Sequence, residues 1–230
     1  MAEQVVLAVD VGGSHVKVLL SSGGERRRFD SGPALTAQQM VDGVKGITGD
    51  LAFDVVSVGV PAPVRDDRVT SEPANLGGGW LDFDFGEAFG KPTKVMNDAA
   101  MQALGSHDGG KMLFLGLGTG LGSAMVVDGV VEPLELAHLP FRKATFEDYV
   151  GQNARERLGK KKWRAAVVET IERLSAAMEP DYVVLGGGNA DKLGDLPAHV
   201  RLGANENAFL GGFRLWDPEV SSVALGPRPE

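Results

Sequence analysis

The sequence predicts a mixed α/β protein, and three observations support this fold class. Apolar runs typical of strands alternate along the chain with longer segments that carry helix signals. Two pairs of apolar runs are joined by short glycine-rich turns, a pattern typical of hairpins. No low-complexity segment or long linker interrupts the 230 residues. The chain is therefore expected to form one large or two small compact domains.

The N-terminal part is predicted to be rich in strands. Residues 4–10 and 15–20 are β-rich and flank the turn Gly12-Gly13-Ser14, which predicts a hairpin. Thr36 is a natural N-cap for a helix over 36–49. A buried strand is expected at 55–61, followed by a loop rich in glycine and proline that extends through Trp80.

The second half repeats the alternation. A short strand at 94–96 leads into the helix start NDAAMQALG, with Asn97 as its N-cap. The runs KMLFLGLG and GSAMVVDG predict a second hairpin. Helices near 146–158 and 162–178, a strand at 181–188 and a final helical segment near 206–215 complete the chain. With hinges near 97 and 205, we expect one domain from residues 1–97 plus 206–230 and another from 98–205.

Composition narrows the protein class. A chain that is 43% hydrophobic and 23% charged is ordinary for a globular protein. The absence of cysteine excludes disulfides and cysteine-ligated zinc, and it fits a reducing compartment. The first residues contain no basic leader, and no run approaches the ~20 apolar residues of a membrane span. A cytoplasmic location is expected.

The charge distribution argues against one class of partner. A formal net charge of −8 disfavours sequence-independent nucleic-acid binding. Two local basic clusters, at 26–28 and 160–162, stand out against this acidic background. A solvated surface is the preferred interpretation of the first cluster.

A glycine-rich device occurs twice. Asp10-Val11-Gly12-Gly13-Ser14 and Leu117-Gly118-Thr119-Gly120-Leu121 each join two apolar strands through a turn that carries a hydroxyl residue. Bare backbone N–H groups in such turns form a concave anion site, and glycine admits a phosphate oxygen to hydrogen-bonding distance. A tight hairpin would explain either copy alone. Two copies, with an aspartate at the end of the first strand, favour phosphate binding.

Other phosphate motifs fail on spacing. The dinucleotide-binding pattern would require glycine at position 121, which is leucine, and a helix where a strand is expected. The stretch GSHDGGKM at 105–112 nearly matches a nucleotide P-loop. Met112 stands where that loop needs Ser or Thr to hold Mg²⁺, and a strand follows it.

Motifs along nearly the whole chain resemble the sugar kinases of the ROK family. They are DVGGS, NDAAMQALG, LGLGTGLG, LELAH and VVLGGGNA, in this order. ANLGGGW, HLPFRKATFEDYVG, RLGKKKW and NAFLGGFRLW resemble the polyphosphate glucokinases of that family most closely. The resemblance implies the actin-like ATPase/ribonuclease H-like superfold, with two α/β domains around a central cleft that closes over sugar and donor.

The resemblance implies a phosphate-donor site. Asp10 is expected to hold Mg²⁺ through water, and no zinc is expected. The remaining donor-binding residues implied by the motifs are Gly12, Gly13, Ser14, Lys17, Gly118, Thr119, Gly120, Gly187 and Gly188. Such a set suits phosphoryl transfer, which depends mainly on positioning and charge stabilisation. A strand-to-helix turn would also explain the glycines at 186–188.

The resemblance also implies a catalytic base and a sugar site. Asp98 matches the general base that takes the proton of the attacking sugar hydroxyl, and its place in the first turn of a helix would keep it ionised. A plain helix cap is the competing interpretation of Asn97-Asp98. The sugar contacts implied are Asn75, Asn97, Asp98, Glu135, His138 and Glu147. Carboxylates and amides suit adjacent sugar hydroxyls because a carboxylate can accept two hydrogen bonds, and an amide can both donate and accept. Taken alone, Glu135 would be a solvated loop residue and His138 a satisfied loop histidine.

Three positions depart from the family pattern. Ala137 replaces a glycine between the glutamate and the histidine, and its methyl group would shift His138 if the backbone needs positive φ. Ala62 replaces a glycine after Pro61, and His15 replaces a glycine beside the donor. These departures bear on sugar identity and rate more than on fold.

The expected function is glucokinase activity, with inorganic polyphosphate or ATP as donor and the 6-hydroxyl of glucose as acceptor. Lys160, Lys161, Lys162 and Arg164, with Arg142 and Lys143, form a candidate basic track for polyphosphate, although the lysines could equally solvate the start of a helix. A ROK-type regulator, a sugar-binding protein without catalysis, and a kinase for another hexose are the alternatives. The start of the sequence directly in the first phosphate strand, without a helix-turn-helix, argues against a regulator. The retained Asp10 and Asp98 argue against a protein that has lost catalysis. The family expectation is a homodimer.

Overall fold

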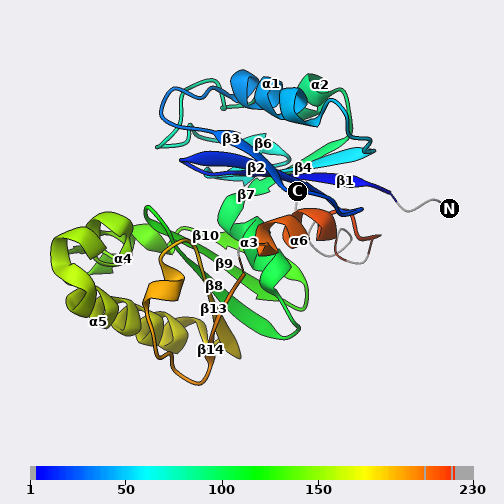
Figure 1. Ribbon diagram of the computed structural model, residues 1–230. Coiled ribbons are helices and arrows are strands. Elements are labelled where there is room, and N and C mark those ends of the chain that lie inside the picture. The colour runs from blue at the N-terminus through cyan, green and yellow to red at the C-terminus, as the bar shows by residue number, and fades with distance from the viewer. Residues whose placement is uncertain (1–3, 205, 219, 221–230) are drawn as a thin grey trace, which may run out of the picture. The chain divides into compact units, whose positions relative to one another are not determined.

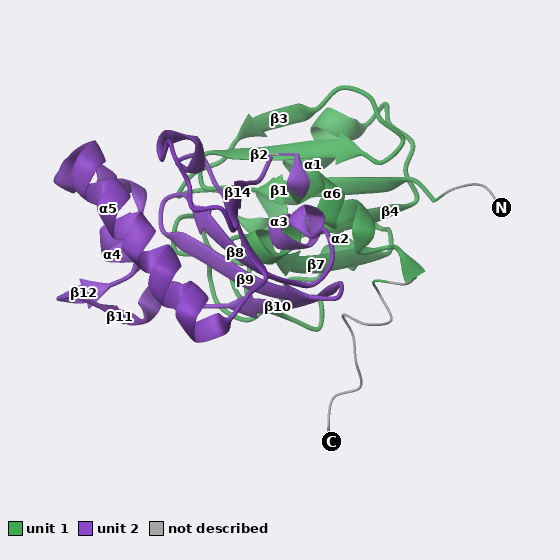
Figure 2. Ribbon diagram, turned by 90° about the horizontal axis from the view of Figure 1, so that it is seen from below, with its two compact units in different colours: residues 1–101, 208–230 green, residues 102–207 purple. Residues whose placement is uncertain are grey.

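The chain folds into two compact units in the computed structural model, which describes residues 4–204, 206–218 and 220. Unit 1 comprises residues 1–101 and 208–230, and unit 2 comprises residues 102–207 (Figure 2). The first boundary falls inside a helix that begins at Asp98, a few residues after the hinge expected at 97. Residues 1–3, 205, 219 and 221–230 of the expected domains lie outside the described residues.

Unit 1 is built on a five-stranded sheet in the order β3-β2-β1-β4-β7. The predicted hairpin is confirmed, because β1 and β2 pair antiparallel with Val9 opposite Val18. On the other side β1 runs parallel to β4, and β4 runs parallel to β7. The strands are β1 (Val6–Val11), β2 (His15–Leu20), β3 (Arg27–Asp30), β4 (Val55–Val60) and β7 (Thr93–Asn97).

Helices cover both faces of this sheet (Figure 1). On one face α1 (Ala37–Thr48) places Met40 and Val44 in a core with alternate residues of the strands. The predicted cap is confirmed, since Thr36 and Gln39 form a reciprocal capping box. The short α2 (Phe85–Phe89) lies on the same face, and α6 (Asn207–Arg214) lies on the other. A two-stranded ribbon, β5 (Val64–Arg65) and β6 (Arg68–Val69), interrupts the loop before Trp80.

A buried serine fastens α6 to the sheet. The Ser57 hydroxyl, in β4, donates to the Gly212 carbonyl at 2.6 Å and accepts from the Trp216 indole at 2.9 Å. A Cβ at Gly212 would lie 2.8 Å from the Ala8 Cβ, so the helix approaches the sheet as closely as glycine permits. The final part of the chain is thereby tied to strands that are about 150 residues earlier in the sequence.

We expect Ser57→Ala to lower the free energy of unfolding by roughly 1–3 kcal/mol, because a buried carbonyl and a partly buried indole lose their partner together. Urea denaturation of the variant measures this loss. Ser22→Ala, at an exposed position, is the matched control and is expected to unfold like the unmodified protein. Equal midpoints for both variants would show that the Ser57 hydroxyl does not secure α6.

In the first basic cluster Arg26 and Arg28 are exposed, as a solvated surface predicts, whereas Arg27 is partly buried. Arg27 lies in β3, where its guanidinium donates to the Ile47 carbonyl and forms a two-pronged ion pair with Asp50. The hydrogen bond from Arg27 lowers the pKa of the Asp50 carboxyl to about 2. Arg27 therefore connects the edge strand β3 to the end of α1. The sequence pattern missed this strand because its own residues alternate little in hydrophobicity.

Unit 2 contains the second sheet, in the order β10-β9-β8-β13-β14. The second predicted hairpin is confirmed by the antiparallel pairing of β8 and β9. On its other side β8 runs parallel to β13, with Gly116 opposite Gly186. The strands are β8 (Lys111–Leu117), β9 (Leu121–Val127), β10 (Val130–Leu134), β13 (Tyr182–Gly186) and β14 (Val200–Leu202).

A long broken helix lies against this sheet. α5 (Gln152–Met178) changes direction at Gly159, whose φ of 73° and ψ of 161° are not helical, so the two helices predicted near 146–158 and 162–178 meet there. α3 (Asp98–Ser106) spans the boundary between the units. The remaining elements are β11 (Pro140–Phe141), β12 (Ala144–Thr145), α4 (Glu147–Val150) and the 3₁₀ turns η1 (Leu136–His138) and η2 (Ala190–Lys192).

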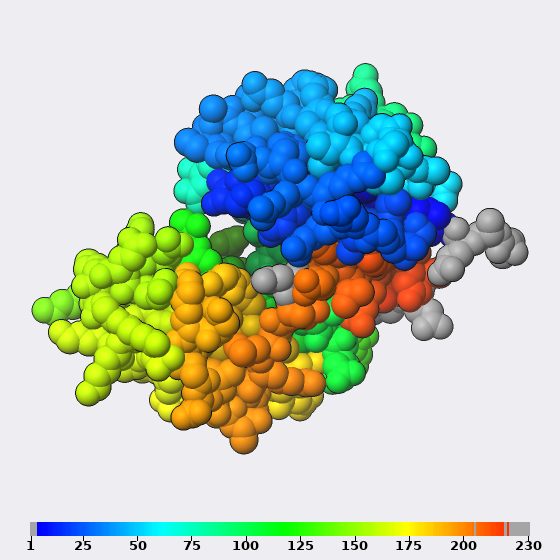
Figure 3. Space-filling view, viewed as in Figure 1, coloured from blue at the N-terminus to red at the C-terminus, as the bar shows by residue number. Residues whose placement is uncertain are grey.

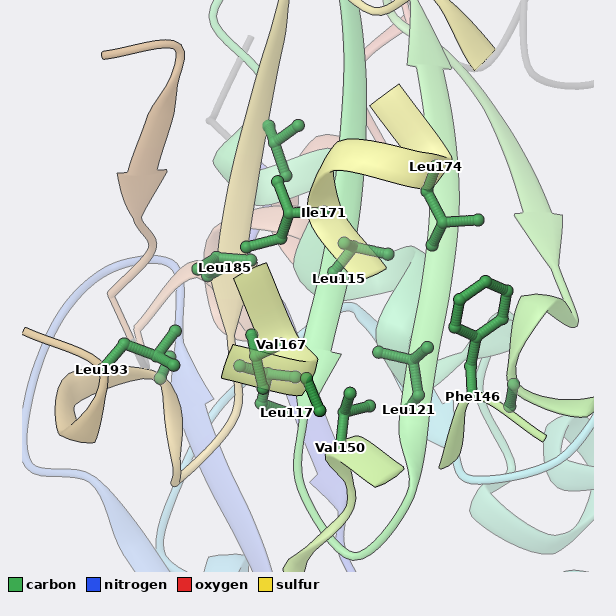
Figure 4. Packing of buried hydrophobic residues seen from close by; sticks show 14 of the residues in the cluster. Leu115, Leu117, Leu121, Phe146, Val150, Val167, Ile171, Leu174, Leu185 and Leu193 are labelled. Atoms are coloured by element: carbon green, nitrogen blue, oxygen red, sulfur yellow. The ribbon is translucent and has the colours of Figure 1, made fainter. Parts of the chain in front are cut away.

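The core of unit 2 is apolar and lies between α5 and the sheet. Figure 4 shows Val167, Ile171 and Leu174 of the helix packed with Leu115 and Leu185 of the strands. Trp163 is fully buried, and its indole donates to the Val150 carbonyl at 2.7 Å. Trp163 is therefore a packing residue of this core.

Within the described residues, no helix combines the length and the apolar character needed to cross a membrane.

Candidate functional site

Both candidate carboxylates of unit 1 lie at one edge of its sheet. β1, β4 and β7 are parallel, so their carboxyl ends share an edge. Asp10 stands near the end of β1, opposite Gly59 of β4, and Asp98 follows the last residue of β7. The carboxyl ends of parallel strands are the usual ligand site of open α/β sheets.

The first glycine turn closes β1 onto β2. The Gly12 amide donates to the His15 carbonyl at 3.0 Å, and the Ser31 hydroxyl donates to the Gly12 carbonyl at 2.6 Å. A Cβ at Gly13 would lie 3.7 Å from the Cβ of Asn75, so the structure brings this predicted sugar contact beside the turn. Asn75 itself is exposed.

Lys17 reaches Asp10 across the hairpin. The two residues are cross-strand neighbours, and the Lys17 ammonium donates to Asp10 Oδ2 at 3.1 Å. Oδ1 of Asp10 accepts no hydrogen bond from the described residues. One carboxylate oxygen fits Mg²⁺, which keeps several waters and takes its other ligands from phosphate oxygens. Among the described residues no group of three or more His, Cys, Asp or Glu could hold a metal ion.

Asn97 and Asp98 begin α3. The Asn97 side chain accepts from the Ala100 amide at 3.1 Å, which confirms it as the N-cap, and donates to the Ala62 carbonyl at 3.3 Å. A sugar contact by Asn97 would have to share these atoms. Asp98 is partly buried, and its Oδ1 accepts from the Ala99 amide at 2.8 Å. Gly59 permits this arrangement, because a Cβ there would lie 3.5 Å from the Asp98 Cα and 2.4 Å from Met101 Cε.

The start of α5 contacts the second glycine turn, at residues 118–120. The Gln152 amide donates to the carbonyls of Gly118 and Thr119 at 3.1 and 3.2 Å. Gly151 permits this contact, since a Cβ at that position would lie 2.6 Å from the Thr119 carbonyl oxygen. A Cβ at Gly118 would meet nothing within 4 Å, so the turn is open on that side.

The predicted sugar residues of unit 2 converge. His138 Nδ1 lies 3.4 Å from Glu147 Oε1, and His138 Nε2 lies 3.8 Å from Glu135 Oε2. These side chains are 37–68% exposed, so a polar ligand can reach them. Glu147 also lies against the glycine turn, where a Cβ at Gly120 would stand 2.6 Å from its Oε2. The cluster therefore joins the predicted sugar residues to the predicted donor turn through one carboxylate.

Local hydrogen bonds fix the position of Glu147. The hydroxyl and the amide of Thr145 donate to Asp148 Oδ2 at 2.6 and 3.0 Å, and these bonds lower the pKa of the Asp148 carboxyl. The bonds connect the β11–β12 hairpin to the first turn of α4. Arg142, in the same hairpin, stacks over Phe141 and pairs with Glu169 at 2.5 Å. Arg142 is therefore engaged in holding the hairpin.

The glycines at 186–188 form a third turn next to the second. The Asn189 amide donates to the Leu117 carbonyl at 3.0 Å, immediately before Gly118. Gly187 has a φ of 79°, and a Cβ on it would lie 2.6 Å from the Leu117 carbonyl carbon and oxygen. A Cβ on Gly188 would meet nothing within 4 Å. Gly186 is also closely packed, since a Cβ there would lie 2.5 Å from Phe114 Cζ, whereas Gly188 leaves its side of the turn open.

The basic run begins the second segment of α5. Lys160, Lys161 and Lys162 are exposed and directly follow the break at Gly159. Arg164 differs from them, because its guanidinium donates through Nε to the Lys192 carbonyl at 2.7 Å. Both interpretations of the lysines, a polyphosphate track and a solvated helix start, stay predictions.

The departures at Ala137 and Ala62 cause no backbone strain. Neither residue is among those with positive φ, and both are 4% exposed. Ala137 packs in the core of unit 2 within η1, so its methyl group does not force His138 away. The third departure, His15, places its Nε2 3.5 Å from Asp30 Oδ1 beside the first turn.

Three side chains near the second and third glycine turns were not predicted from the sequence. Asn189 is buried and contacts Gly118, while Arg155 and Lys192 both bind Asn189. Their positions in the sequence, on α5 and in η2, give no spacing that would associate them. The one available signal in the sequence was Asn189 itself, a polar residue directly after three glycines.

Comparison with known proteins places these features in a family. Residues 6–133 match the model of the ROK family, which is more than half of the chain. The polyphosphate glucokinase of Mycobacterium tuberculosis is 26% identical over 209 residues, covering 80% of this chain and 77% of that protein. A glucokinase of Halalkalibacterium halodurans is 31% identical over 153 residues, covering 56% of this chain and 46% of that protein.

A solved structure supports the same placement. The inorganic polyphosphate/ATP-glucomannokinase of Arthrobacter sp. strain KM is 25% identical, with a TM-score of 0.79 over 91% of this chain and 96% of that one. With the two five-stranded α/β units, this likeness confirms the actin-like ATPase fold class. The resemblance first drawn from short motifs is also confirmed: the chain belongs to the ROK family.

Proposed function

We propose that this protein is a sugar kinase that transfers a phosphoryl group from inorganic polyphosphate or ATP to the 6-hydroxyl of glucose. The observation that carries the proposal is the double contact of Glu147, which lies beside His138 and also against Gly120. One carboxylate thus links a polar cluster suited to sugar hydroxyls with a glycine turn suited to phosphate. Sequence relatives named glucokinase and polyphosphate glucokinase support the same reaction class.

The residues of unit 1 would supply the reacting groups. Asp98, a partly buried residue directly after β7, would accept the proton of the attacking hydroxyl. Asp10 would hold Mg²⁺ through water, and the bound ion would neutralise charge on the donor phosphates. Lys17 would keep the Asp10 carboxylate oriented through its hydrogen bond to Oδ2. The amides of Gly12, Gly13 and Ser14 would contact donor oxygens.

The residues of unit 2 would bind the sugar and the rest of the donor. Glu135, His138 and Glu147 would hold adjacent hydroxyls. Asn75, beside the first glycine turn, stays a predicted sugar contact. Gly118, Thr119, Gly120, Gly187 and Gly188 would line the donor. Excluding water from the reacting groups would favour transfer to the sugar over hydrolysis. A cytoplasmic location and a homodimer remain predictions.

Glu135→Ala is expected to weaken glucose binding by roughly 5–150-fold, which corresponds to the 1–3 kcal/mol cost of leaving polar groups unpaired. Calorimetric titration with glucose measures the change. Glu132→Ala, at an exposed position of β10 three residues earlier, is the matched control and should bind normally. Unchanged glucose affinity in alanine variants of Glu135, His138 and Glu147 would remove the sugar site from this cluster.

A product assay tests the proposed function. The protein is incubated with Mg²⁺, glucose and either ATP or long-chain polyphosphate, and glucose 6-phosphate is followed with a coupled dehydrogenase. Parallel reactions with mannose test the alternative of another hexose. Sugar binding without sugar phosphate, for any donor and hexose, would instead support a regulatory or purely sugar-binding protein.

A further inference from the structure

Asn189 is a buried polar residue that has no role in the proposed reaction. Its side chain is held at every polar atom, and the residue is 3% exposed. The side-chain amide donates to the Gly118 carbonyl at 3.3 Å, and the backbone amide donates to the Leu117 carbonyl. Asn189 is therefore fixed rigidly against the second glycine turn, between the ends of β8 and β13.

Two cations converge on its remaining atom. Asn189 Oδ1 accepts from Arg155 Nη1 at 3.1 Å and from Lys192 Nζ at 2.8 Å. The two nitrogen atoms consequently lie within about 6 Å of each other, where like charges repel unless an anion is close. Among the described residues, neither cation forms an ion pair with a carboxylate. A neutral amide oxygen thus holds two positive charges, and no carboxylate in the described part of the chain pairs with either of them.

The cation pair is placed beside open backbone. Asn189 joins it to Gly118, and a Cβ at Gly118 or at Gly188 would meet nothing within 4 Å. Arg155 and Lys192 are each only partly buried, so a ligand can reach them. The open turns supply space and amide donors for phosphate oxygens, and the pair supplies the charge.

The backbone of Lys192 is itself anchored. Arg164 donates to the Lys192 carbonyl, and a Cβ at Gly194 would lie 3.2 Å from Arg164 Nη2. Figure 3 shows the amber surface around residue 190 beside the yellow-green surface of the first part of α5, from which Arg155 comes. Two segments more than 30 residues apart are thus held together so that both cations point at one atom.

We propose that Arg155 and Lys192, held by Asn189, bind the phosphate groups of the donor that are not transferred. The ligand is a linear chain of phosphates, as in inorganic polyphosphate or the triphosphate of ATP. This inference deepens the proposed kinase function and rests on it, because the bound phosphate chain is a donor only if the protein is a kinase. It assigns the binding of the negatively charged donor to a fixed pair of cations next to the glycine turns, in addition to the exposed lysines at 160–162.

The test is binding of inorganic tripolyphosphate, measured by calorimetry with Mg²⁺ present. Arg155→Gln and Lys192→Gln are each expected to weaken binding about tenfold or more, because each removes a charge-assisted contact. Arg157→Gln is the control, since this exposed arginine on the same helix donates only to the Asp148 carbonyl. Glucose affinity should be unchanged in all three variants, and urea midpoints identify any variant that fails to fold.

Conservative variants separate charge from structure. Arg155→Lys and Lys192→Arg keep the charge, so they should restore most of the tripolyphosphate affinity and its dependence on salt. A purely structural role predicts the opposite, with all changes affecting stability and none affecting the salt dependence. Titrations with long-chain polyphosphate and with ATP distinguish the two sources of the phosphate chain.

The outcomes separate this inference from the function on which it rests. Tripolyphosphate binding that depends on both cations in a protein that phosphorylates no hexose would retain the anion site and reject the kinase. Sugar phosphorylation with wild-type donor affinity in the Arg155→Gln/Lys192→Gln variant would reject the anion site and retain the kinase. Failure of the unmodified protein to bind tripolyphosphate would also overturn the inference.

Discussion

Asp98→Asn is expected to reduce sugar phosphorylation by roughly 10²–10⁴-fold, the range typical of general-base catalysis. An amide cannot take the proton of the attacking hydroxyl, but its oxygen can still accept from the Ala99 amide as Asp98 does. The variant should therefore fold and bind glucose like the unmodified protein. Steady-state rates with saturating sugar and donor measure the loss.

Asp42→Asn is the matched control for this change, because Asp42 is exposed on α1 and accepts only from the Gln38 side chain. Its turnover should be that of the unmodified protein. Near-normal turnover in Asp98→Asn would leave Asn97-Asp98 as a plain helix start, the competing interpretation of the sequence.

Gly187→Ala is expected to destabilise the protein by roughly 2–4 kcal/mol, the combined effect of a left-handed backbone and overpacking. Gly187 has a φ of 79°, and its new Cβ would lie 2.6 Å from two backbone atoms of Leu117. Because Leu117 directly precedes Gly118, any relaxation would displace the second glycine turn. Chemical denaturation measures the stability, and donor affinity in the folded fraction measures the displacement.

The neighbouring residue provides the control. Gly188→Ala places its methyl group in open space at a position without positive φ, so the free energy of unfolding should change by less than about 0.5 kcal/mol. Equal stability of the two alanine variants would mean that the third turn relaxes freely, and it would refute the close contact between β13 and the end of β8.

The sequence predicted those elements whose signals are local. Thr36 and Asn97 cap helices through their own side chains, and both glycine-rich hairpins close within a few residues. Periodicity and turn chemistry report such features directly. Edge strand β3 has no local signal, because Arg27 is held there by Asp50, which follows α1.

The candidate site divides in the same way. Glu135, His138 and Glu147 came from motif resemblance, and the structure shows that they converge on one another. Asn189 with its two cations could not be foreseen, because that cluster requires the register of β8 against β13 and the path of α5. The family pattern raised the question of a positive φ at Ala137. The structure shows that φ is not positive there, and the sequence alone could not reveal this backbone angle.

The central claim, phosphoryl transfer to a sugar hydroxyl, is tested most directly by ³¹P nuclear magnetic resonance of the reacting mixture. The sample contains the protein, Mg²⁺, glucose and either ATP or polyphosphate. We predict a new phosphomonoester resonance coupled to the C6 methylene protons of glucose, growing as the donor is consumed and suppressed in Asp98→Asn. Release of inorganic phosphate alone, or an unchanged donor spectrum with every hexose, would contradict the claim.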